Sequence, residues 1–263
     1  MKKILSLSFL VVFLFNACKS DSKKENNLST EELLKEENAI KLTSISLESN
    51  AFEICKENEC PSIDLNYLVA EGENADKINA QNQAYLVEIF NSTPDSSTSK
   101  NLEEAAENFI KEYFEFKNEF PESPAGYEAE LSQEELVKND SLLTYKTKFY
   151  LFTGGAHGYG AIRYLNFNVQ NGKLLSISDL FSNEAAFTAY AEKQFRKKFN
   201  ITTESINSNG FFFEDDTYSL PENIAITEEE VILIYNPYEA ASYAQGQLEL
   251  IFKKEDVQEY LNF

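Results

Sequence analysis

Two neighbouring segments of the chain alternate between apolar and polar residues, as β-strands with one buried face do. The first is marked by Leu143, Tyr145, Thr147, Phe149 and Leu151. A second strand is predicted over residues 162–169. Asn171 and Gly172 follow it and are a strong hairpin signal, because both residue types tolerate positive φ. Residues 140–181 are therefore expected to form a strand, a glycine-rich crossing, a strand, a tight turn and a strand.

Apolar residues at three- and four-residue spacing predict helices over residues 75–90, 101–119 and 182–199. Ser182 is expected to cap the last of these. Alternating segments predict further strands over residues 45–54, 63–69, 224–226, 231–235 and 247–252, and a short helix is expected over 255–263. Strands and helices come in runs, which favours the α+β class with largely antiparallel sheets and packed helices. Two intimately associated subdomains are expected, over residues 39–125 and 126–263.

The start of the chain has the pattern of a targeting segment. Two lysines precede an apolar run over residues 4–15, which is too short to remain as a membrane span, and Ala17-Cys18 follows. This pattern predicts a lipoprotein signal peptide over residues 1–17, with a lipid such as palmitate on Cys18. The alternative is an ordinary cleaved signal with a chance cysteine. Residues 18–38 are polar and predict a flexible tether, so the protein is expected on the periplasmic or outer-membrane face of the cell envelope.

The chain is strongly acidic. Removing residues 1–17 removes two lysines and no acid, which takes the formal net charge from −21 to −23. This balance argues against nucleic acid and anionic lipid surfaces as partners. It is compatible with a solvated acidic surface or with a cationic partner.

The cysteines that follow Cys18 are Cys55 and Cys60, and they lie between two alternating segments. We interpret these segments as a hairpin whose loop is closed by a disulfide between Cys55 and Cys60. The alternatives are free thiols or a metal site. Two cysteines with one distant histidine make a poor zinc site, so no metal and no cofactor is expected.

The glycine-rich crossing holds the only histidine, His157, together with Gly154, Gly155, Gly158 and Gly160. It lacks the Gly-Lys-Ser/Thr end of a phosphate-binding loop, and Gly-Ala-His-Gly is not a nucleophile elbow. Paired acids such as Asp215 and Asp216 could cleave glycans, but such pairs arise by chance in so acidic a chain. The glycines could serve close chain packing, a ligand contact or, with His157, catalysis.

Several segments together resemble the DUF3298 family. They are Phe152-Thr-Gly-Gly-Ala-His-Gly158, Tyr164-Leu-Asn-Phe167, Asn171-Gly-Lys173, Ser178-Asp-Leu-Phe181 and Asn236-Pro-Tyr-Glu-Ala-Ala-Ser-Tyr-Ala-Gln-Gly246. Residues 45–120 are similar to the companion DUF4163 region. Related domain pairs bind lysozyme outside the membrane in anti-sigma factors, and they accompany a peptidoglycan deacetylase as a non-catalytic part. The present sequence has neither a transmembrane segment with a sigma-binding part nor a deacetylase-like segment, so the resemblance implies extracytoplasmic binding.

We therefore expect a lipid-anchored envelope binding protein and not an enzyme, with a lysozyme-like protein or peptidoglycan as its ligand. The residues expected to contact the ligand or to hold the motif are Gly154, Gly155, His157, Gly158, Tyr159, Asn236, Pro237, Tyr238, Tyr243 and Gly246. The alternative is an envelope enzyme that acts on cell-wall glycan through His157 and nearby acids. A third possibility is a scaffold in which the motif only holds the fold.

Overall fold

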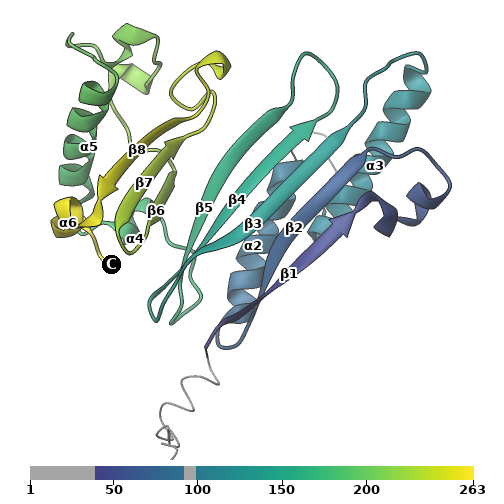
Figure 1. Cartoon of the computed structure of the whole chain (residues 1–263), viewed down its shortest axis with the longest axis horizontal. Helices are drawn as coiled ribbons and strands as arrows, with labels where there is room; N and C mark the ends of the chain where they lie inside the picture. The colour runs from purple at the N-terminus through teal and green to yellow at the C-terminus, as the bar shows by residue number, and fades with distance from the viewer. Residues whose placement is uncertain (1–38, 92–98) are drawn as a thin grey trace, which may run out of the picture. The chain divides into compact units, whose positions relative to one another are not determined.

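The computed structural model describes residues 39–91 and 99–263. The predicted signal peptide, the predicted lipidation site at Cys18 and the predicted tether lie outside these residues. No helix in the described part of the chain is long and apolar enough to cross a membrane. Residues 38–263 form one compact unit, and its two sheets with packed helices confirm the α+β class (Figure 1).

The larger sheet has five strands in the order β1-β2-β3-β4-β5. They are β1 (Lys41–Glu48), β2 (Ser62–Glu71), β3 (Glu128–Lys138), β4 (Leu142–Phe152) and β5 (Tyr159–Asn168). All neighbours pair antiparallel except β2 and β3, which pair in parallel. A parallel pair needs a crossover connection, and here the crossover contains the two helices α2 (Ala75–Phe90) and α3 (Leu102–Glu119).

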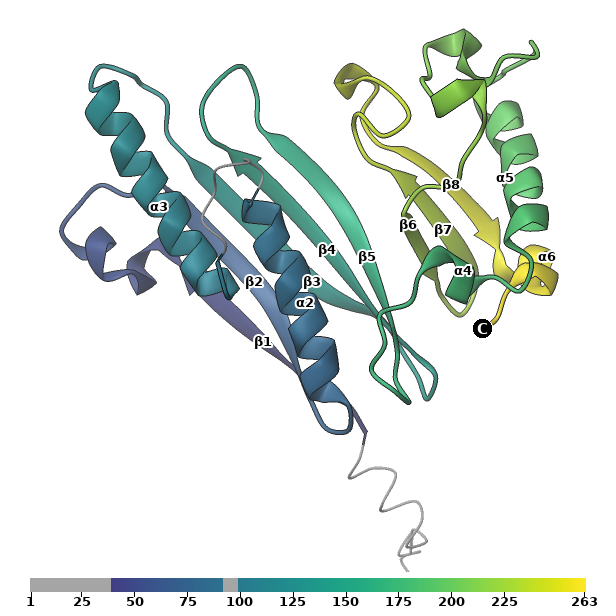
Figure 2. The ribbon, with the colours of Figure 1, turned by 180° about the vertical axis from the view of Figure 1, so that it is seen from behind.

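The helices α2 and α3 lie on one face of this sheet (Figure 2). The buried residues of α3 recur at three- and four-residue spacing, so one stripe of the helix faces the sheet. Asn101 caps α3 by accepting a hydrogen bond from the backbone N–H of Glu104 at 2.9 Å. Beneath α2, Gln133 of β3 bonds Asn82, Thr147 and the backbone N–H of Leu68, which satisfies a buried polar group between helix and sheet.

The smaller sheet consists of β6 (Asn223–Ile226), β7 (Glu230–Tyr235) and β8 (Leu248–Lys253), all antiparallel. The helix α5 (Glu184–Lys198) packs beside it, and the short helices α4 (Ile177–Leu180) and α6 (Lys254–Val257) both lie near its lower end in the view of Figure 1. The core under α5 is aromatic. The fully buried ring of Phe195 lies within 5.8 Å, centroid to centroid, of the rings of Phe199, Phe211, Phe213, Tyr218 and Tyr235.

Two asparagines join the sheets. The buried side chain of Asn166 on β5 donates to the carbonyl of Ile224 on β6 at 2.7 Å. Asn236, which follows β7, donates to the carbonyl of Ile162 and accepts from its backbone N–H, both at 2.9 Å. Asn236 thus pairs with β5 in the way that a neighbouring strand would. All four residues belong to the predicted part 126–263, so these bonds join the large sheet to the small one within that part.

The structure departs from the predicted hairpin over residues 45–54 and 63–69. The strands pair antiparallel as predicted, but β1 ends at Glu48, and the loop contains the 3-10 helices η1 (Ser49–Ala51) and η2 (Glu53–Lys56). The hydroxyl of Ser49 donates to the carbonyl of Pro61 and accepts from the N–H of Ile63, which turns the chain out of the strand. The predicted disulfide between Cys55 and Cys60 is present in this loop, with the Cα atoms 5.4 Å apart.

Other predicted elements differ at their ends. The strand expected after Gly172 is only an isolated bridge between Phe167 and Leu174, because the chain turns into α4. The helix α5 is capped by Asn183 and not by Ser182, whose backbone N–H and hydroxyl bond the carbonyls of Tyr260 and Glu259. The helix expected over residues 255–263 is the shorter α6 followed by the 3-10 helix η6 (Gln258–Tyr260).

The strand β3 has no counterpart among the predicted elements. The proposed division between residues 125 and 126 falls in the loop before it. The large sheet takes β1 and β2 from one side of that division and β3, β4 and β5 from the other. The division remains a prediction.

Candidate functional site

The two motifs singled out in the sequence meet in space. The β4–β5 loop carries the glycines and His157, and the β7–β8 loop carries residues 236–246; both lie at the same end of their sheets (Figure 1). The ring of His157 stacks on the ring of Tyr243, with centroids 4.1 Å apart and planes 16° apart. The Tyr243 hydroxyl also donates to the carbonyl of Gly158 at 3.2 Å.

The protonation of His157 follows from its contacts. Its Nδ1 lies 2.9 Å from the carbonyl oxygen of Gly158, which can only accept a hydrogen bond. Nδ1 therefore carries a proton and donates it to that carbonyl. The same oxygen also accepts from Tyr243, so Gly158 is the point at which the two loops are joined.

Glycine is required in the β4–β5 loop for two different reasons. Gly154 and Gly155 have φ of +89° and +91°, which side-chain-bearing residues rarely adopt. At Gly158 the reason is space, because a Cβ atom would lie 2.6 Å from the carbonyl oxygen of Leu151. The loop thus folds back closely on the end of β4, as the packing interpretation of the glycines predicts.

The β7–β8 loop is held by its own polar side chains. The carboxylate of Glu239 accepts from the backbone N–H groups of Asn236 and Glu222 at 2.9 and 3.2 Å. Burial raises the pKa of Glu239, and these two hydrogen bonds oppose the rise. Gly246 ends the loop at φ +68°. The buried Pro237 precedes Tyr238, which has φ +72° and a 54% exposed side chain.

A cavity of about 590 Å³ lies where these loops meet the helices. The residues from the predicted motifs that line it are Gly154, His157, Gly158, Tyr159 and Tyr238. The other walls are Tyr85, Glu88, Ile89 and Phe90 of α2, Phe109 and Glu112 of α3, Tyr127, and Phe149, Leu151 and Thr153 of β4 and its end. Its size is typical of sites for small molecules or single side chains. The structure thus joins the motifs and places Tyr238, rather than Asn236 or Gly246, at the cavity.

The helix residues of this cavity could not be recognised in the sequence. Tyr85, Phe90 and Phe109 belong to stripes that also carry core residues such as Ile89. A stripe of this kind predicts residues of the hydrophobic core. In the structure, only the partial exposure of Tyr85 and Phe90 distinguishes them from core residues. The backbone of Tyr238 is the clearest signal after the fact, because positive φ at a bulky residue marks strain.

The cavity is aromatic and acidic. Glu88 and Glu112 are its acids, and none of the described residues that line it is lysine or arginine. Burial, and then the nearby Glu115, raise the pKa of Glu112. Burial and the charge of Glu239 raise the pKa of Tyr159. On these walls burial disfavours charge, and the neighbouring acids disfavour negative charge in particular.

Two candidates for chemistry from the sequence, His157 and Asp216, have structural contacts in the described part of the chain. No group of three His, Cys, Asp or Glu side chains among residues 39–91 and 99–263 could hold a metal ion. His157 forms its hydrogen bond with the backbone carbonyl of Gly158 rather than with an acid. Asp216, one of the paired acids, accepts from the hydroxyl of Ser205 and the N–H of Asn207, so it stabilises a loop.

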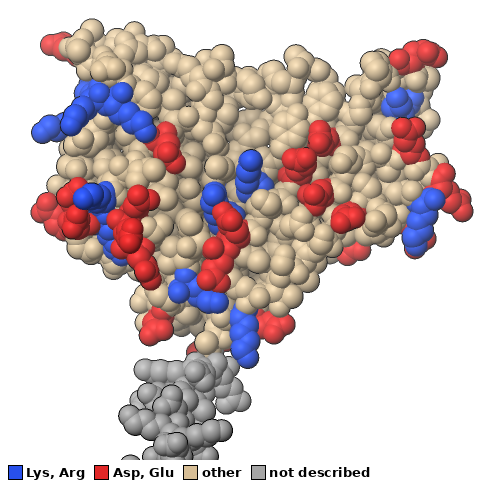
Figure 3. All heavy atoms as spheres, in the orientation of Figure 1, with Lys and Arg blue, Asp and Glu red and all other residues tan. Residues whose placement is uncertain are grey.

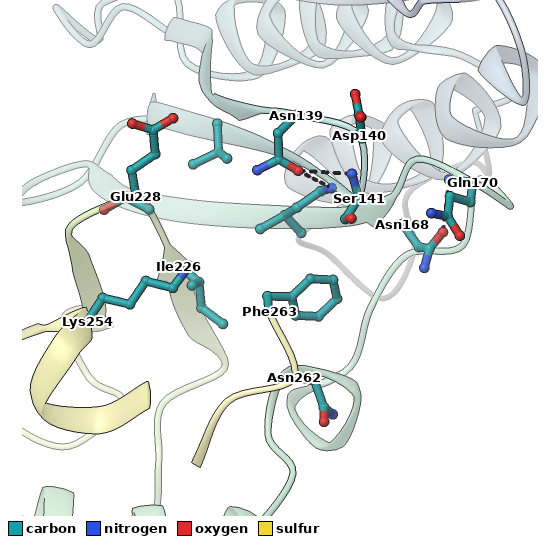
Figure 4. Close-up of a pocket in the computed structure, with 13 residues that line it drawn as sticks. Asn139, Asp140, Ser141, Asn168, Gln170, Ile226, Glu228, Lys254, Asn262 and Phe263 are labelled. Carbon is teal, nitrogen blue, oxygen red and sulfur yellow. Dashed lines mark hydrogen bonds between the residues drawn. The ribbon is translucent and has the colours of Figure 1, made fainter. Parts of the chain in front are cut away.

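A larger cleft of about 900 Å³ lies elsewhere, between the β3–β4 turn, the β6–β7 turn and the end of the chain (Figure 4). Its labelled side chains include Asn139, Asn168, Glu228, Lys254 and Phe263. The side-chain oxygen of Asn139 is used to cap its own turn, by accepting from the N–H groups of Ser141 and Leu142. This cleft shares no lining residue with either motif, so we place the candidate site at the aromatic cavity.

The fold and the cavity describe an α+β protein with two sheets and a ligand-sized site at their shared end. Comparison with known proteins places it further. Residues 178–255 match the family described as Protein of unknown function (DUF3298), which confirms the resemblance to DUF3298. Residues 54–159 match the family model described as Deacetylase PdaC.

Two solved structures share the fold. One is a DUF3298 family member from Bacteroides fragilis, which is 20% identical with a TM-score of 0.63, and the match covers 86% of this chain and 95% of that one. The other is a DUF3298 family protein from Pseudomonas aeruginosa, which is 18% identical with a TM-score of 0.58, and the match covers 85% and 94%. No curated protein matches this chain.

The cavity lies where the two matched regions meet. All of its described lining residues from Tyr85 to Tyr159 fall within the match to the deacetylase model, whereas Tyr238 falls within the DUF3298 match. Phe152–Gly158, which carried part of the resemblance to DUF3298, lies in the deacetylase match. Fourteen of the fifteen described lining residues thus come from the match to the deacetylase model, and Tyr238 is the one contributed by the DUF3298 match.

Proposed function

We propose that this protein is a lipid-anchored binding protein of the cell envelope, and that its ligand enters the aromatic cavity beside the His157–Tyr243 stack. The ligand would come from peptidoglycan or from a lysozyme-like protein. The observation that carries the proposal is that both motifs, from distant parts of the chain, meet at one cavity of ligand size. The match of residues 54–159 to a model named for a deacetylase supports an envelope setting.

Binding is favoured over catalysis by the state of His157. A general base needs a free nitrogen near the reacting group and, in most sites, an acid that orients the ring. Here Nδ1 donates to a backbone carbonyl rather than to an acid, and Tyr243 covers one ring face, while Nε2 is the nitrogen left to accept a proton. These contacts suit a side chain that holds two loops together.

The surface supports the same proposal. Charged side chains gather over the middle and lower parts of the face in Figure 3, whereas its upper edge, where the two loops lie in Figure 1, is largely uncharged. The cavity itself is walled by aromatic rings together with the acids Glu88 and Glu112, and a concave site with a few polar groups is typical of ligand recognition.

The test is a pull-down with residues 38–263, which form one compact unit, against purified peptidoglycan and against lysozyme, each at low and moderate salt. We expect saturable binding that weakens about tenfold in Tyr238→Ala, because this exposed aromatic ring lines the cavity. Tyr190→Ala, an aromatic substitution beside α5, should bind as the unchanged protein does. The proposal would be overturned if Tyr238→Ala bound as tightly as the unchanged protein. It would also be overturned if the protein turned over glycan and His157→Ala did not.

The lipid anchor requires its own experiment. Cys18→Ser should leave the full chain unprocessed and without lipid, whereas the unchanged protein should fractionate with membranes. Mass measurement of the N-terminal peptide checks both. An unlipidated N-terminus in the unchanged protein would refute the anchor and leave the binding proposal standing.

A further inference from the structure

The walls of the aromatic cavity suit a particular kind of ligand. Seven of the described lining residues carry aromatic rings other than imidazole: Tyr85, Phe90, Phe109, Tyr127, Phe149, Tyr159 and Tyr238. The faces of such rings are electron-rich and attract organic cations. Sugars and apolar groups also stack on aromatic rings, so the rings alone do not decide the charge of the ligand.

The acids of the cavity decide the charge. Glu88 and Glu112 line it from neighbouring helices, and neither forms an ion pair within the described residues. The lysines of α3 are engaged elsewhere: Lys111 lies 3.9 Å from Glu107, and Lys117 donates to the carbonyl of Ser123 at 2.7 Å. An anionic ligand would meet two carboxylates and no matching base.

One wall already holds a cation on an aromatic ring. The guanidinium carbon of Arg163 lies 5.9 Å from the centroid of the Tyr85 ring. Its charge is matched by Glu222, whose carboxylate is 2.8 Å from Arg163 Nη1. Arg163 therefore does not neutralise Glu88 or Glu112.

We infer that the cavity selects a ligand with an alkylammonium group on an apolar stem, held between the aromatic rings and the carboxylates of Glu88 and Glu112. This inference rests on the proposed function, because it names the chemistry of the ligand at the same site. Both proposed sources can supply the group: peptidoglycan through free amines, and a protein through lysine side chains. The inference excludes ligands whose recognised group is a phosphate or a carboxylate.

The first experiment compares three probes of one shape, n-hexylammonium, hexan-1-ol and hexanoate, by calorimetric or NMR titration of residues 38–263. We expect the ammonium to bind with a Kd of about 1 mM, about tenfold more tightly than the alcohol. Hexanoate should not bind. Equal affinity for the ammonium and the alcohol, or tighter binding of hexanoate, would overturn the inference.

A charge-matched pair of variants separates a local effect from the overall acidity of the protein. Glu88→Gln with Glu112→Gln should weaken ammonium binding about tenfold and leave alcohol binding unchanged. Glu228→Gln with Glu229→Gln changes the net charge equally at the β6–β7 turn, and it should bind as the unchanged protein does. Equal losses of ammonium affinity in both double variants would mean that the affinity comes from the overall negative charge of the protein. Such a result would refute a cation site at Glu88 and Glu112.

Acetylation of the amines of each candidate ligand identifies which macromolecule supplies the ammonium group. Acetylation removes the charge of free amines in peptidoglycan or of lysines in lysozyme, and binding should be lost for whichever is the true ligand. Tyr238-dependent binding that survives acetylation of both ligands would retain the proposed function and refute the cation. Binding of hexylammonium without binding of either macromolecule would retain the cation chemistry and refute the proposed source.

Discussion

The imidazole ring of His157 lies flat against the phenol ring of Tyr243, with 4.1 Å between their centroids, and both residues donate a hydrogen bond to the carbonyl of Gly158. The two side chains come from loops more than 80 residues apart in the chain, since Tyr243 and Gly158 are separated by 85 positions. The contact fixes the rim of the cavity by joining the large sheet to the small one.

The first prediction concerns this contact. Tyr243→Phe keeps the stack and loses one hydrogen bond, so it should lower the free energy of unfolding by about 0.5–1 kcal/mol. Tyr243→Ala loses the stack as well and should cost about 2 kcal/mol. Urea unfolding checks both. Tyr238→Phe, whose ring is exposed, serves as the control and should change stability by less than about 0.5 kcal/mol. Equal costs for the two Tyr243 variants would mean that the stack contributes nothing.

The second prediction concerns the close approach at Gly158. Gly158→Ala would bring a Cβ atom within 2.6 Å of the Leu151 carbonyl oxygen and within 2.4 Å of the Tyr150 ring. Because a backbone atom is involved, the loop must shift, and we expect a loss of about 2 kcal/mol in the free energy of unfolding.

Gly126→Ala is the matched control, because its added Cβ atom meets no atom within 4 Å. It should leave stability unchanged or raise it slightly, through the reduced freedom of the unfolded chain. If thermal unfolding showed the same shift for both alanine variants, the steric account of Gly158 would be wrong.

The sequence was sufficient to predict the long helices and several of the strands. The helices over residues 75–90 and 101–119 agree with α2 and α3 to within one residue, because their apolar spacing is clear and Asn101 is a good cap. The alternation over β4 was also a reliable signal, since Leu143, Tyr145 and Thr147 are buried. The Asn171-Gly172 turn follows β5 as predicted.

The strand β3 was missed because its exposed positions are acidic. Glu128, Glu130 and Glu134 alternate with the buried Ala129, Leu131 and Gln133, and a buried glutamine does not read as a core residue. Similarly, Phe212 is 46% exposed although its neighbours Phe211 and Phe213 are buried. Local patterns identify the faces of an element but not the partner that covers them.

The candidate site was predicted only in part. The motif residues were found, and Gly154, His157, Gly158, Tyr159 and Tyr238 do line one cavity. The lining residues on α2 and α3 were not predicted. The apolar stripe of a helix does not show which of its residues pack in the core and which line a cavity. The joining of β4–β5 and β7–β8 loops depends on how the two sheets pack, which no local pattern specifies.

The third prediction concerns the buried polar cluster below α2. Gln133→Ala would remove the partners of Asn82, Thr147 and the Leu68 N–H in a buried place. Leaving these groups unsatisfied should cost about 3 kcal/mol or more of unfolding free energy, measured in urea. Gln170→Ala, at an exposed turn, should cost less than about 0.5 kcal/mol. A similar small loss at Gln133 would show that water replaces its hydrogen bonds.

The fourth prediction concerns the disulfide between Cys55 and Cys60. It closes a loop of sequence separation 5, so its loss should lower the free energy of unfolding by about 2 kcal/mol through the freedom gained by the unfolded chain. Reductant should therefore shift the urea midpoint of the unchanged protein. It should have no effect on a Cys55→Ser, Cys60→Ser double variant, which should already unfold at the lower midpoint. A shift by reductant in the double variant would assign the effect to something other than this bond.

The last prediction concerns the acid stability contributed by Asp179. Hydrogen bonds from Lys173, and then from the side chain and backbone of Ser176, lower its pKa to about 2. A carboxylate whose pKa is lower in the folded than in the unfolded state stabilises the fold above the unfolded pKa of about 3.9, and this contribution is lost as the pH falls toward 2. The unfolding free energy of the unchanged protein minus that of Asp179→Asn should thus shrink between pH 5 and pH 2. In Lys173→Met the pKa of Asp179, followed by NMR, should rise, because its strongest hydrogen-bond donor is gone. A difference that stayed constant with pH would show that Asp179 is not stabilised in its charged form.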